Sequence, residues 1–445
     1  MNLSRPLSRR SFLRQLAAAG AAAPFITRGL IAAPPSSVIR HASFGGAGMA
    51  MSDLTGFKSH PHFRLVCVAE VDAARTAKLK EAFPEAKVYQ DWREMLDREH
   101  ANLDSVNVST PDHMHAPMGM SALQLGLHVY GQKPLAHDVF ECRRLAEFGS
   151  EKKLVTQMGI QIHSSVEYRS AVQLIQAGAI GKVREVHTWS SKKWSDPQLR
   201  PDSSDPVPAG FNWDLWLGVC APRPFLAGGY YHPGNWRKRI DFGTGTFGDM
   251  GCHIYDPVFK ALQLTAPLSV RSEGPPPNAD NWGENAVVHY TFPGTSFSAD
   301  STVRVTWYDG DQRPPPEVRA QLGTVKQPDQ GSIFLGTDGI LVLPHVGRPI
   351  LLPEEKSAAA PQPTLEPVSH WHQFLDAVQG KGATSAHFGY AGPLTEAVLL
   401  GGIASRFPQT TLEWDAAAMQ FRNLPAANQF LRRTYRPGWE VKGLA

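Results

Sequence analysis

The feature that most constrains the fold is a regular alternation of short β-like and helical segments between residues 37 and 157. Apolar runs at 38–44 and 63–71 alternate with segments of helical periodicity such as 73–83. Strands and helices that alternate at this pitch form right-handed βαβ units, which build a parallel sheet with helices on both faces. This part of the chain is therefore predicted to be a doubly wound α/β domain.

The pattern changes after residue 157. Longer β-rich runs follow, with few helices between them and with Pro/Gly-rich loops separating them, at 183–190, 286–292, 301–308 and 331–343. This composition predicts a large, mostly antiparallel sheet in an α+β domain. A length of 445 residues also exceeds what one core usually organises. The predicted divisions are a segment at 1–33, a first domain at 34–157, a second at 158–435 and a tail at 436–445.

Three helices and one exposed loop are predicted within the second domain and the segments that follow it. The helices lie at 168–177, 369–379 and 393–406, and the loop lies at 356–363.

The turn after the first predicted strand resembles a dinucleotide-binding turn, G-x-G-x-x-G, and reads G-G-A-G-M-A at residues 45–50. Aligned from Gly45, the second and third glycine positions hold Ala47 and Ala50. Alanine is an accepted variant at the third position, whereas the Ala47 methyl lies where the phosphates should come closest. Gly46 and Gly48 are expected to let the loop adjust. The predicted cofactor contacts of this turn are Gly45, Ala47, Gly48 and Met49.

An acidic side chain at the end of the second strand supports a Rossmann-type domain. Glu70 follows Gly45 by 25 positions, against about 20 in the usual pattern. A carboxylate there accepts hydrogen bonds from ribose hydroxyls and repels a 2′-phosphate, so NAD is favoured. Asp72 is a competing candidate two residues later, and Arg75 keeps NADP open.

Charge and cysteine usage exclude several functional classes. The chain carries 44 basic and 41 acidic residues, without the strong positive charge of a nucleic-acid-binding protein. No apolar run of about 18 residues occurs beyond the first forty, so no transmembrane segment is predicted in the mature chain. The four cysteines, Cys67, Cys142, Cys220 and Cys252, form no C-x-x-C pair, which predicts buried free thiols. No metal site is predicted.

Residues 1–33 have the pattern of a twin-arginine (Tat) export signal. Arg9 and Arg10 precede an apolar stretch at 16–26, and the small residues Ala32 and Ala33 follow it. The pattern predicts a periplasmic or extracytoplasmic protein. Because the Tat route carries folded proteins, a cofactor is expected to be bound before export and retained afterwards.

Three further segments carry the decisive residues, and the first two of them follow predicted strands. They read S-T-P-D-H-M-H at 109–115, G-Q-K-P-L at 131–135, and N-W-R at 235–237 followed by G-T-G-T-F-G-D-M-G-C-H-I-Y-D at 243–256. In this order they resemble the T-P-x-x-x-H, E-K-P and D-x-x-x-H motifs of the Gfo/Idh/MocA oxidoreductases, which include glucose–fructose oxidoreductase and inositol dehydrogenase. The resemblance is close from Val38 to Tyr308.

The resemblance implies roles for individual residues. It makes Lys133 the E-K-P lysine, near both nicotinamide and substrate hydroxyl, and Asp249 and His253 the family's acid and histidine. Gln132 departs from the family's Glu, so a proton relay cannot depend on a carboxylate there. The implied cofactor contacts in these segments are Ser109, Thr110, Pro111, His115, Gln132, Lys133 and Gln161. The predicted substrate residues are Tyr168, Trp236, Arg237 and His253, with a core position as the alternative for Trp236.

The chemistry of a hydroxyl oxidation fits these residues. Asp249 and His253 are four positions apart and share one face of a helix, so Asp249 is expected to orient or charge-stabilise the imidazole. The imidazole of His253 would then act as a base near neutral pH. Lys133 follows a strand, and its ammonium can stabilise a developing alkoxide.

Three functions remain open at this point. The first is NAD(P)-dependent hydride transfer at a hydroxyl-bearing carbon of a sugar or cyclitol, with a retained cofactor. The second is a redox-neutral, NAD-dependent glycoside hydrolase that oxidises, eliminates, hydrates and reduces. The third is a non-catalytic sugar-binding protein on the same fold, which Ala47 and Gln132 motivate. A homodimer or homotetramer is expected from the family.

Overall fold

The computed structural model describes residues 38–353, 355 and 364–445. The predicted export signal at 1–33 and the predicted exposed loop at 356–363 lie outside these residues.

The first sheet confirms the predicted parallel architecture. Its six strands are all parallel and lie in the order β3-β2-β1-β4-β5-β6, the strand order of a Rossmann domain. The strands are β1 (Ile39–Phe44), β2 (Phe63–Ala69), β3 (Lys87–Tyr89), β4 (Ser105–Val108), β5 (His128–Gln132) and β6 (Thr156–Gly159).

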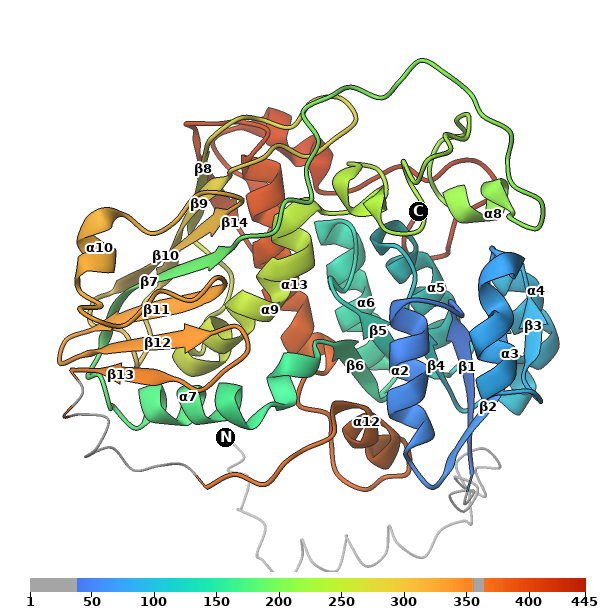
Figure 1. Ribbon diagram of the computed structural model, residues 1–445, viewed down its shortest axis with the longest axis horizontal. Helices are drawn as coiled ribbons and strands as arrows, with labels where there is room; N and C mark the ends of the chain where they lie inside the picture. The colour runs from blue at the N-terminus through green and yellow to red at the C-terminus, as the bar shows by residue number, and fades with distance from the viewer. Residues whose placement is uncertain (1–37, 354, 356–363) are drawn as a thin grey trace, which may run out of the picture. The chain divides into compact units, whose positions relative to one another are not determined.

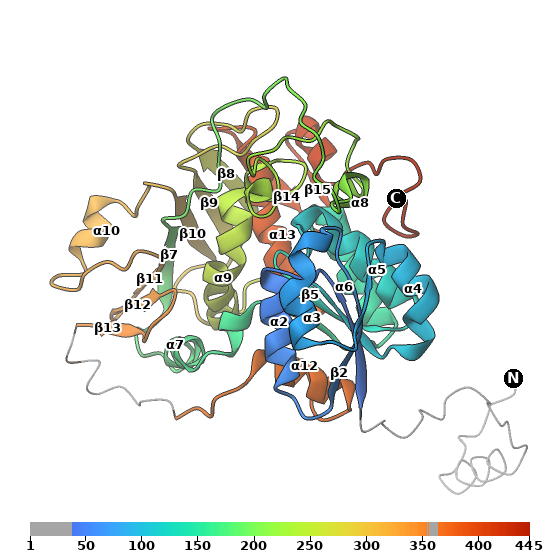
Figure 2. The same cartoon turned by 45° about the vertical axis from the view of Figure 1, so that its right-hand side comes forward.

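Helices cover both faces of this sheet, α2 and α3 on one side and α4, α5 and α6 on the other (Figure 2). Asp91 and Asp138 begin two of them, because each carboxylate accepts a backbone N–H of the first turn. The helices are α2 (Met49–Lys58), α3 (Ala77–Ala82), α4 (Trp92–Glu99), α5 (His115–Gln124) and α6 (Val139–Glu151). Short 3₁₀ turns are η1 (Ala73–Thr76), η2 (His100–Asn102), η3 (Asp112–Met114) and η4 (Gln161–Ser164).

The second sheet has nine strands in the order β13-β12-β11-β7-β10-β9-β8-β14-β15. All neighbouring pairs are antiparallel except β7 and β10, which confirms the predicted mostly antiparallel sheet. The strands are β7 (Val183–Ser190), β8 (Ser269–Glu273), β9 (Val287–Pro293), β10 (Thr302–Asp309), β11 (Gly331–Gly336), β12 (Ile340–Pro344), β13 (Ile350–Leu352), β14 (Thr411–Asp415) and β15 (Gln420–Phe421).

Two long helices, α9 and α13, lie between the two sheets (Figure 1). One contiguous hydrophobic cluster runs from the first sheet through α9 and α13 to the second, so the two domains share a core. The remaining elements of this half are α7 (Val166–Gln176), α8 (Trp213–Leu217), η5 (Asn235–Lys238), α9 (Gly245–Leu262), α10 (Pro316–Ala320), α12 (His370–Val378), α13 (Phe388–Ala404) and η6 (Pro425–Phe430).

Two predicted elements differ from the structure. The run at 331–343 is a hairpin of β11 and β12, because the chain reverses at residues 337–339. The last long helix begins at Phe388 rather than at Pro393, which lies inside it. Proline at the first helical position is the common case, and the apolar residues before it extend this helix by more than a turn.

Four smaller observations complete the fold. All four cysteines are buried and free, as predicted. In the segment 436–445, Trp439, Val441 and Leu444 are buried against the rest of the protein. None of the helices in the described part of the chain is long and apolar enough to cross a membrane. The described residues also hold no group of three or more His, Cys, Asp or Glu that could bind a metal ion.

Candidate active site

A cavity of about 220 Å³ opens at the carboxyl ends of β1, β2, β4 and β5. Open α/β sheets bind ligands at this edge, where the strand order reverses between β1 and β4. The predicted site residues that line the cavity are Gly45, Ala47, Gly48, Met49, Glu70, Ser109, Thr110, Pro111, Gln132, Lys133, Trp236 and Arg237. Those that do not line it are Asp72, His115, Gln161, Tyr168, Asp249 and His253.

The turn at the cavity floor needs glycine at two positions. Gly45 has φ of 100°, and a Cβ there would stand 2.7 Å from the carbonyl oxygen of Ser109. Gly48 has φ of 57° and is the N-cap of α2. Ala47, which holds the second glycine position of the motif, has a partly exposed side chain.

The start of α2 fits the pyrophosphate of a dinucleotide. No side chain caps this helix, and its first turn carries no acidic residue. Its first N–H groups and the positive end of its dipole therefore face the cavity without a protein anion beside them. The residues present fit the cofactor.

Glu70 and Asp72 were both candidates for the acid that binds the ribose, and only Glu70 lines the cavity. The Glu70 side chain lines the cavity, and its carboxylate accepts N–H bonds from Gly46 at 2.9 Å and from Asp72 at 3.0 Å. Burial raises the pKa of the Glu70 carboxyl. Asp72 instead accepts hydrogen bonds from Ala74 N at 3.1 Å and His232 Nε2 at 3.1 Å. Glu70 is thus the acid that a ribose would meet.

Behind the cavity lies a buried carboxylate that the sequence analysis did not single out. It accepts hydrogen bonds from five side chains, one of which is the Tyr130 hydroxyl at 3.5 Å. Asp53 of α2 is fully buried. Its oxygens accept hydrogen bonds from Ser109 Oγ at 2.8 Å, Gln132 Nε2 at 2.8 Å, Trp371 Nε1 at 2.9 Å and Gln161 Nε2 at 3.3 Å. Burial raises the pKa of the Asp53 carboxyl, and these donors oppose that shift.

Asp53 explains why Gln stands at position 132. An amide donates to the neighbouring carboxylate, whereas a second carboxylate at 2.8 Å would repel it. The Gln132 carbonyl oxygen also accepts the Lys133 backbone N–H at 3.3 Å, so the same side chain connects Asp53 to the lysine.

Two residues implied as cofactor contacts hold the protein together instead. The Gln161 amide donates to Asp53 and to Tyr130 Oη. The His115 ring bonds the carbonyl oxygens of Pro134 at 2.7 Å and Thr110 at 2.8 Å. His115 therefore links the loops after β4 and β5, and neither His115 nor Gln161 lines the cavity.

Lys133 ends in a cluster of charges around Asp249. Its Nζ donates to the Asp249 carboxylate at 2.7 Å and to the Asp249 carbonyl oxygen at 2.6 Å. Arg237 Nε lies 3.0 Å from the same carboxylate, Trp194 Nε1 donates at 2.8 Å and Lys192 Nζ lies at 3.6 Å. Burial alone would raise the pKa of Asp249, but the charges of Lys133 and Arg237 hold it well below its ordinary value.

The carboxylate of Asp249 is therefore a counter-ion. It is 7% exposed, and both oxygens are engaged. The expectation that Asp249 orients the His253 imidazole through a hydrogen bond is wrong, because its hydrogen bonds go to Lys133, Arg237 and Trp194. The alternative, charge stabilisation, holds in direction, because the charge of Asp249 acts to raise the pKa of His253. Three cations around one carboxylate leave a local excess of positive charge.

His253 lies one helical turn after Asp249 and lines a separate small pocket with Tyr168 and His345. Burial, aided by the charge of Lys133, lowers the pKa of His253 well below its ordinary value, so the imidazole is neutral. Within the described residues, its buried Nδ1 has no hydrogen-bond partner. Tyr168 is turned inward, with its hydroxyl 3.3 Å from His163 Nδ1, so the structure does not bring it to Trp236 and Arg237.

Comparison with known proteins agrees with this geometry. Residues 40–160 match the model of the oxidoreductase family with an NAD-binding Rossmann fold, and residues 178–299 match that family's C-terminal alpha/beta domain. The chain belongs to the Gfo/Idh/MocA family. Its first domain is an NAD-binding Rossmann domain.

Individual relatives of this family member are distant. Levoglucosan dehydrogenase of Pseudarthrobacter phenanthrenivorans is 23% identical over 189 residues, which cover 42% of this chain and 40% of that protein. Glycosyl hydrolase family 109 protein 1 of a Shewanella species is 28% identical over 119 residues, 26% of each chain. The chain thus spans less than half the length of either relative.

Among solved structures, the WlbA dehydrogenase of Bordetella pertussis, in complex with NADH and UDP-GlcNAcA, superposes with a TM-score of 0.60. Identity is 14%, and the match covers 85% of this chain and 99% of that one. At this identity the likeness shows the shared fold.

Several residues of the site were missed from the sequence. Lys192 and Trp194 come from the loop after β7, far from any motif. Asp53 had a signal that could have been used, because it shares the buried face of α2 with Ala50, Leu54 and Phe57. An acid on an otherwise apolar face predicts a buried polar network.

Proposed function

We propose that this Gfo/Idh/MocA protein transfers a hydride between NAD and a hydroxyl-bearing carbon of a sugar or cyclitol. The observation that carries the proposal is the position of Lys133, which lines the NAD cavity and is fixed there by Asp249. An ammonium at this point can hold the reacting oxygen next to the nicotinamide end of the cavity.

Lys133, His253 and Arg237 have separate roles in the proposed reaction. When bound, NAD accepts the hydride from the carbinol carbon or returns it. Lys133 donates a hydrogen bond to the substrate oxygen and stabilises its negative charge as the proton leaves. His253, one helical turn after Asp249, is the proposed acceptor of that proton. Arg237, stacked on Trp236 at 4.2 Å, lines the same wall and offers a hydrogen-bonding fork to the substrate.

Denaturing extraction and mass spectrometry of the purified protein test the cofactor part of this proposal. NAD(H) in near-stoichiometric amount supports tight retention, and NADP(H) in its place would reverse the assignment of Glu70. Aldoses, cyclitols and levoglucosan are then added while the nicotinamide absorbance is followed. A protein that neither contains nor binds nicotinamide cofactors would instead be the non-catalytic sugar-binding alternative.

The second candidate is a redox-neutral glycoside hydrolase, which the similarity to a family 109 protein favours. In that reaction, oxidation of a hydroxyl acidifies the neighbouring C–H, the aglycone leaves by elimination, water adds, and the hydride returns. The same Lys133 and His253 would serve. Chromogenic glycosides without added NAD separate the candidates, because aglycone release contradicts a simple dehydrogenase.

We further propose Tat-dependent export of the folded, cofactor-loaded protein to the periplasm, on the basis of Arg9, Arg10 and the apolar stretch after them. Replacing both arginines by lysine should keep the protein in the cytoplasm, which cell fractionation measures. We also propose a homodimer or homotetramer through the face of the nine-stranded sheet opposite α9 and α13. Light scattering of the purified protein gives the oligomer size.

A further inference from the structure

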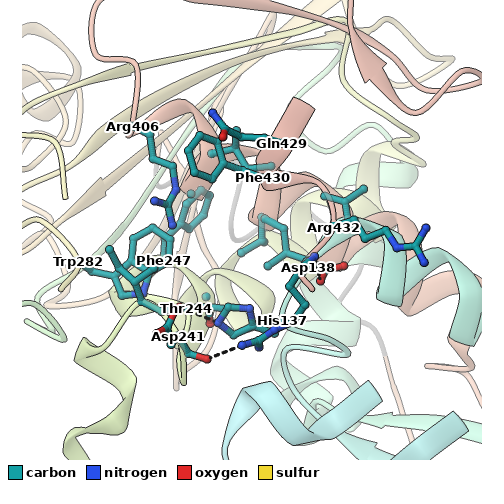
Figure 3. Close-up of a pocket in the computed structure, with 18 of the residues that line it drawn as sticks. His137, Asp138, Asp241, Thr244, Phe247, Trp282, Arg406, Gln429, Phe430 and Arg432 are labelled. Atoms are coloured by element: carbon teal, nitrogen blue, oxygen red, sulfur yellow. Dashed lines mark hydrogen bonds between the residues drawn. The ribbon is translucent and has the colours of Figure 1, made fainter. Parts of the chain in front are cut away.

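A second cavity, of about 330 Å³, lies between α6, the start of α9, the end of α13 and η6 (Figure 3). It is separate from the NAD cavity, and Thr244 forms part of the wall between them. Thr244 lines the second cavity, while its Oγ1 donates at 2.7 Å to Asp112, which lines the first. No step of the proposed reaction uses this second space.

Arg406, just past the end of α13, points into this cavity between aromatic rings (Figure 3). Its guanidinium carbon lies 4.4 Å from the ring centre of Phe430 and 5.3 Å from that of Trp282. In the described part of the chain, no residue forms an ion pair or hydrogen bond with this guanidinium. Such a partly buried guanidinium is stacked on aromatic rings but forms no ion pair with a described residue. It can therefore donate charge-assisted hydrogen bonds to the carboxylate of a ligand.

A second arginine, Arg433, also lines the cavity. Arg433 Nη2 donates to the Asp241 carbonyl oxygen and to Cys220 Sγ, each at 3.1 Å. Its Nε and Nη1 atoms are buried and have no partner among the residues described. Buried guanidinium nitrogens without acceptors are costly, so they indicate a missing hydrogen-bonding group.

The acidic side chains of the cavity wall are already engaged. The Asp241 carboxylate forms an ion pair with Arg223. The Asp138 carboxylate accepts the backbone N–H groups of Glu141 at 2.9 Å and Arg433 at 3.0 Å. His137 is neutral, because burial and then the charge of Arg433 lower its pKa well below the ordinary value. The N-termini of α6 and α9 also reach this wall and add positive potential.

The remaining walls are apolar. They are formed by Val139, Ile240, Phe247, Val398, Leu399 and Ile403. We propose that this cavity is a second ligand site, which binds a small carboxylate with an apolar or aromatic body. The carboxylate lies on Arg406, and the body lies against Phe430, Trp282 and the apolar wall. This inference is independent of the proposed function.

Fluorine NMR of para-fluorobenzoate, with neutral para-fluorobenzamide as its isostere, tests the proposal on the full chain with saturating NAD. We expect the benzoate to bind more tightly than the amide. Arg406→Gln should weaken benzoate binding by about tenfold or more, the loss of a charge-assisted hydrogen bond. Arg432→Gln is the matched control: Arg432 also borders the cavity, but its guanidinium points away from Arg406 (Figure 3) and stacks on Phe140 at 4.2 Å.

A second variant keeps the test decisive if Arg406→Gln unfolds. Ala279 is exposed where it lines the cavity, so Ala279→Trp should block entry while leaving Arg406 in place. Arg237→Gln, in the NAD cavity, should leave benzoate binding unchanged. The proposal is overturned by absence of benzoate binding to the wild type, by equal binding of the amide, by unchanged binding in Ala279→Trp, or by loss in Arg237→Gln alone.

Discussion

Gln132→Glu places a second carboxyl group against Asp53 in the polar cluster behind Lys133. In the wild type, the Gln132 amide lies 2.8 Å from an Asp53 oxygen. Two unit charges at that distance repel by roughly 6 kcal/mol at an effective dielectric constant of 20. Partial protonation and relaxation reduce this figure, so we expect a loss of about 3–5 kcal/mol in the free energy of unfolding near neutral pH.

The loss should depend on pH, and its sign follows from the pKa of Asp53. Burial already raises that pKa, and a second carboxyl raises it further. The folded variant therefore binds a proton that the unfolded chain releases. Its stability relative to the wild type is preserved below the ordinary carboxyl pKa of about 4 and is lost as the pH rises through the folded value. Urea unfolding followed by tryptophan fluorescence across this range measures the effect.

The double variant Asp53→Asn/Gln132→Glu exchanges amide and carboxylate and restores the family's E-K-P sequence. It should recover about 2 kcal/mol or more of the loss, since neighbours in one hydrogen-bond network couple by up to about 3 kcal/mol. Gln198→Glu, the same change at an exposed loop position, is the control and should be neutral. A Gln132→Glu variant with a pH-independent stability, or a double variant no more stable than the single one, would refute this reasoning.

Three further predictions concern the NAD cavity. Lys133→Met should lower kcat/KM by about 10²–10⁴-fold while the bound NAD(H) measured by mass spectrometry is unchanged; unchanged turnover would exclude Lys133 from the chemistry. Glu70→Gln should raise binding of NADP relative to NAD, measured by titration of cofactor-free protein, because the carboxylate that repels the 2′-phosphate is gone; an unchanged ratio would contradict its role. Gly45→Ala should lower the free energy of unfolding by about 1–3 kcal/mol and reduce NAD retention. The reason is that the added methyl would stand 2.7 Å from the Ser109 carbonyl oxygen, at a residue whose φ is 100°. Normal stability and cofactor content would show that the turn can move.

Much of the fold followed from local patterns. Hydrophobic periodicity and glycine positions are local properties that locate the strands and helices. Because the crossovers between parallel strands are right-handed, few strand orders are then possible. That order brings the loops after Phe44, Val108 and Gln132 to a single edge, so motifs far apart in sequence could be expected to meet. The start of α13 was misplaced because Pro393 imitates a first helical residue while the surrounding packing extends the helix backwards.

The rest depended on long-range contacts that no local pattern encodes. His115 and Gln161 have side chains suited to a cofactor, and in the structure they form hydrogen bonds to Pro134 and Asp53. The Tyr168 hydroxyl likewise forms a hydrogen bond with His163. In each case, the residue type was compatible with two partners, and only the packed structure decided between them.

The lysine at the centre of the site is held from both domains at once. From the first sheet, the Asp53–Gln132 pair fixes the end of β5, at which Lys133 begins its loop. From the second half of the chain, Asp249 on α9 binds its ammonium. The ammonium can therefore reach the NAD cavity in a defined position only when α9 is packed between the two sheets. The carboxylate of Asp249 has to stay ionised to hold Lys133, so the group that accepts the substrate proton has to be another one. In the proposed function that group is His253, one turn further along α9, whose side chain borders a separate small cavity.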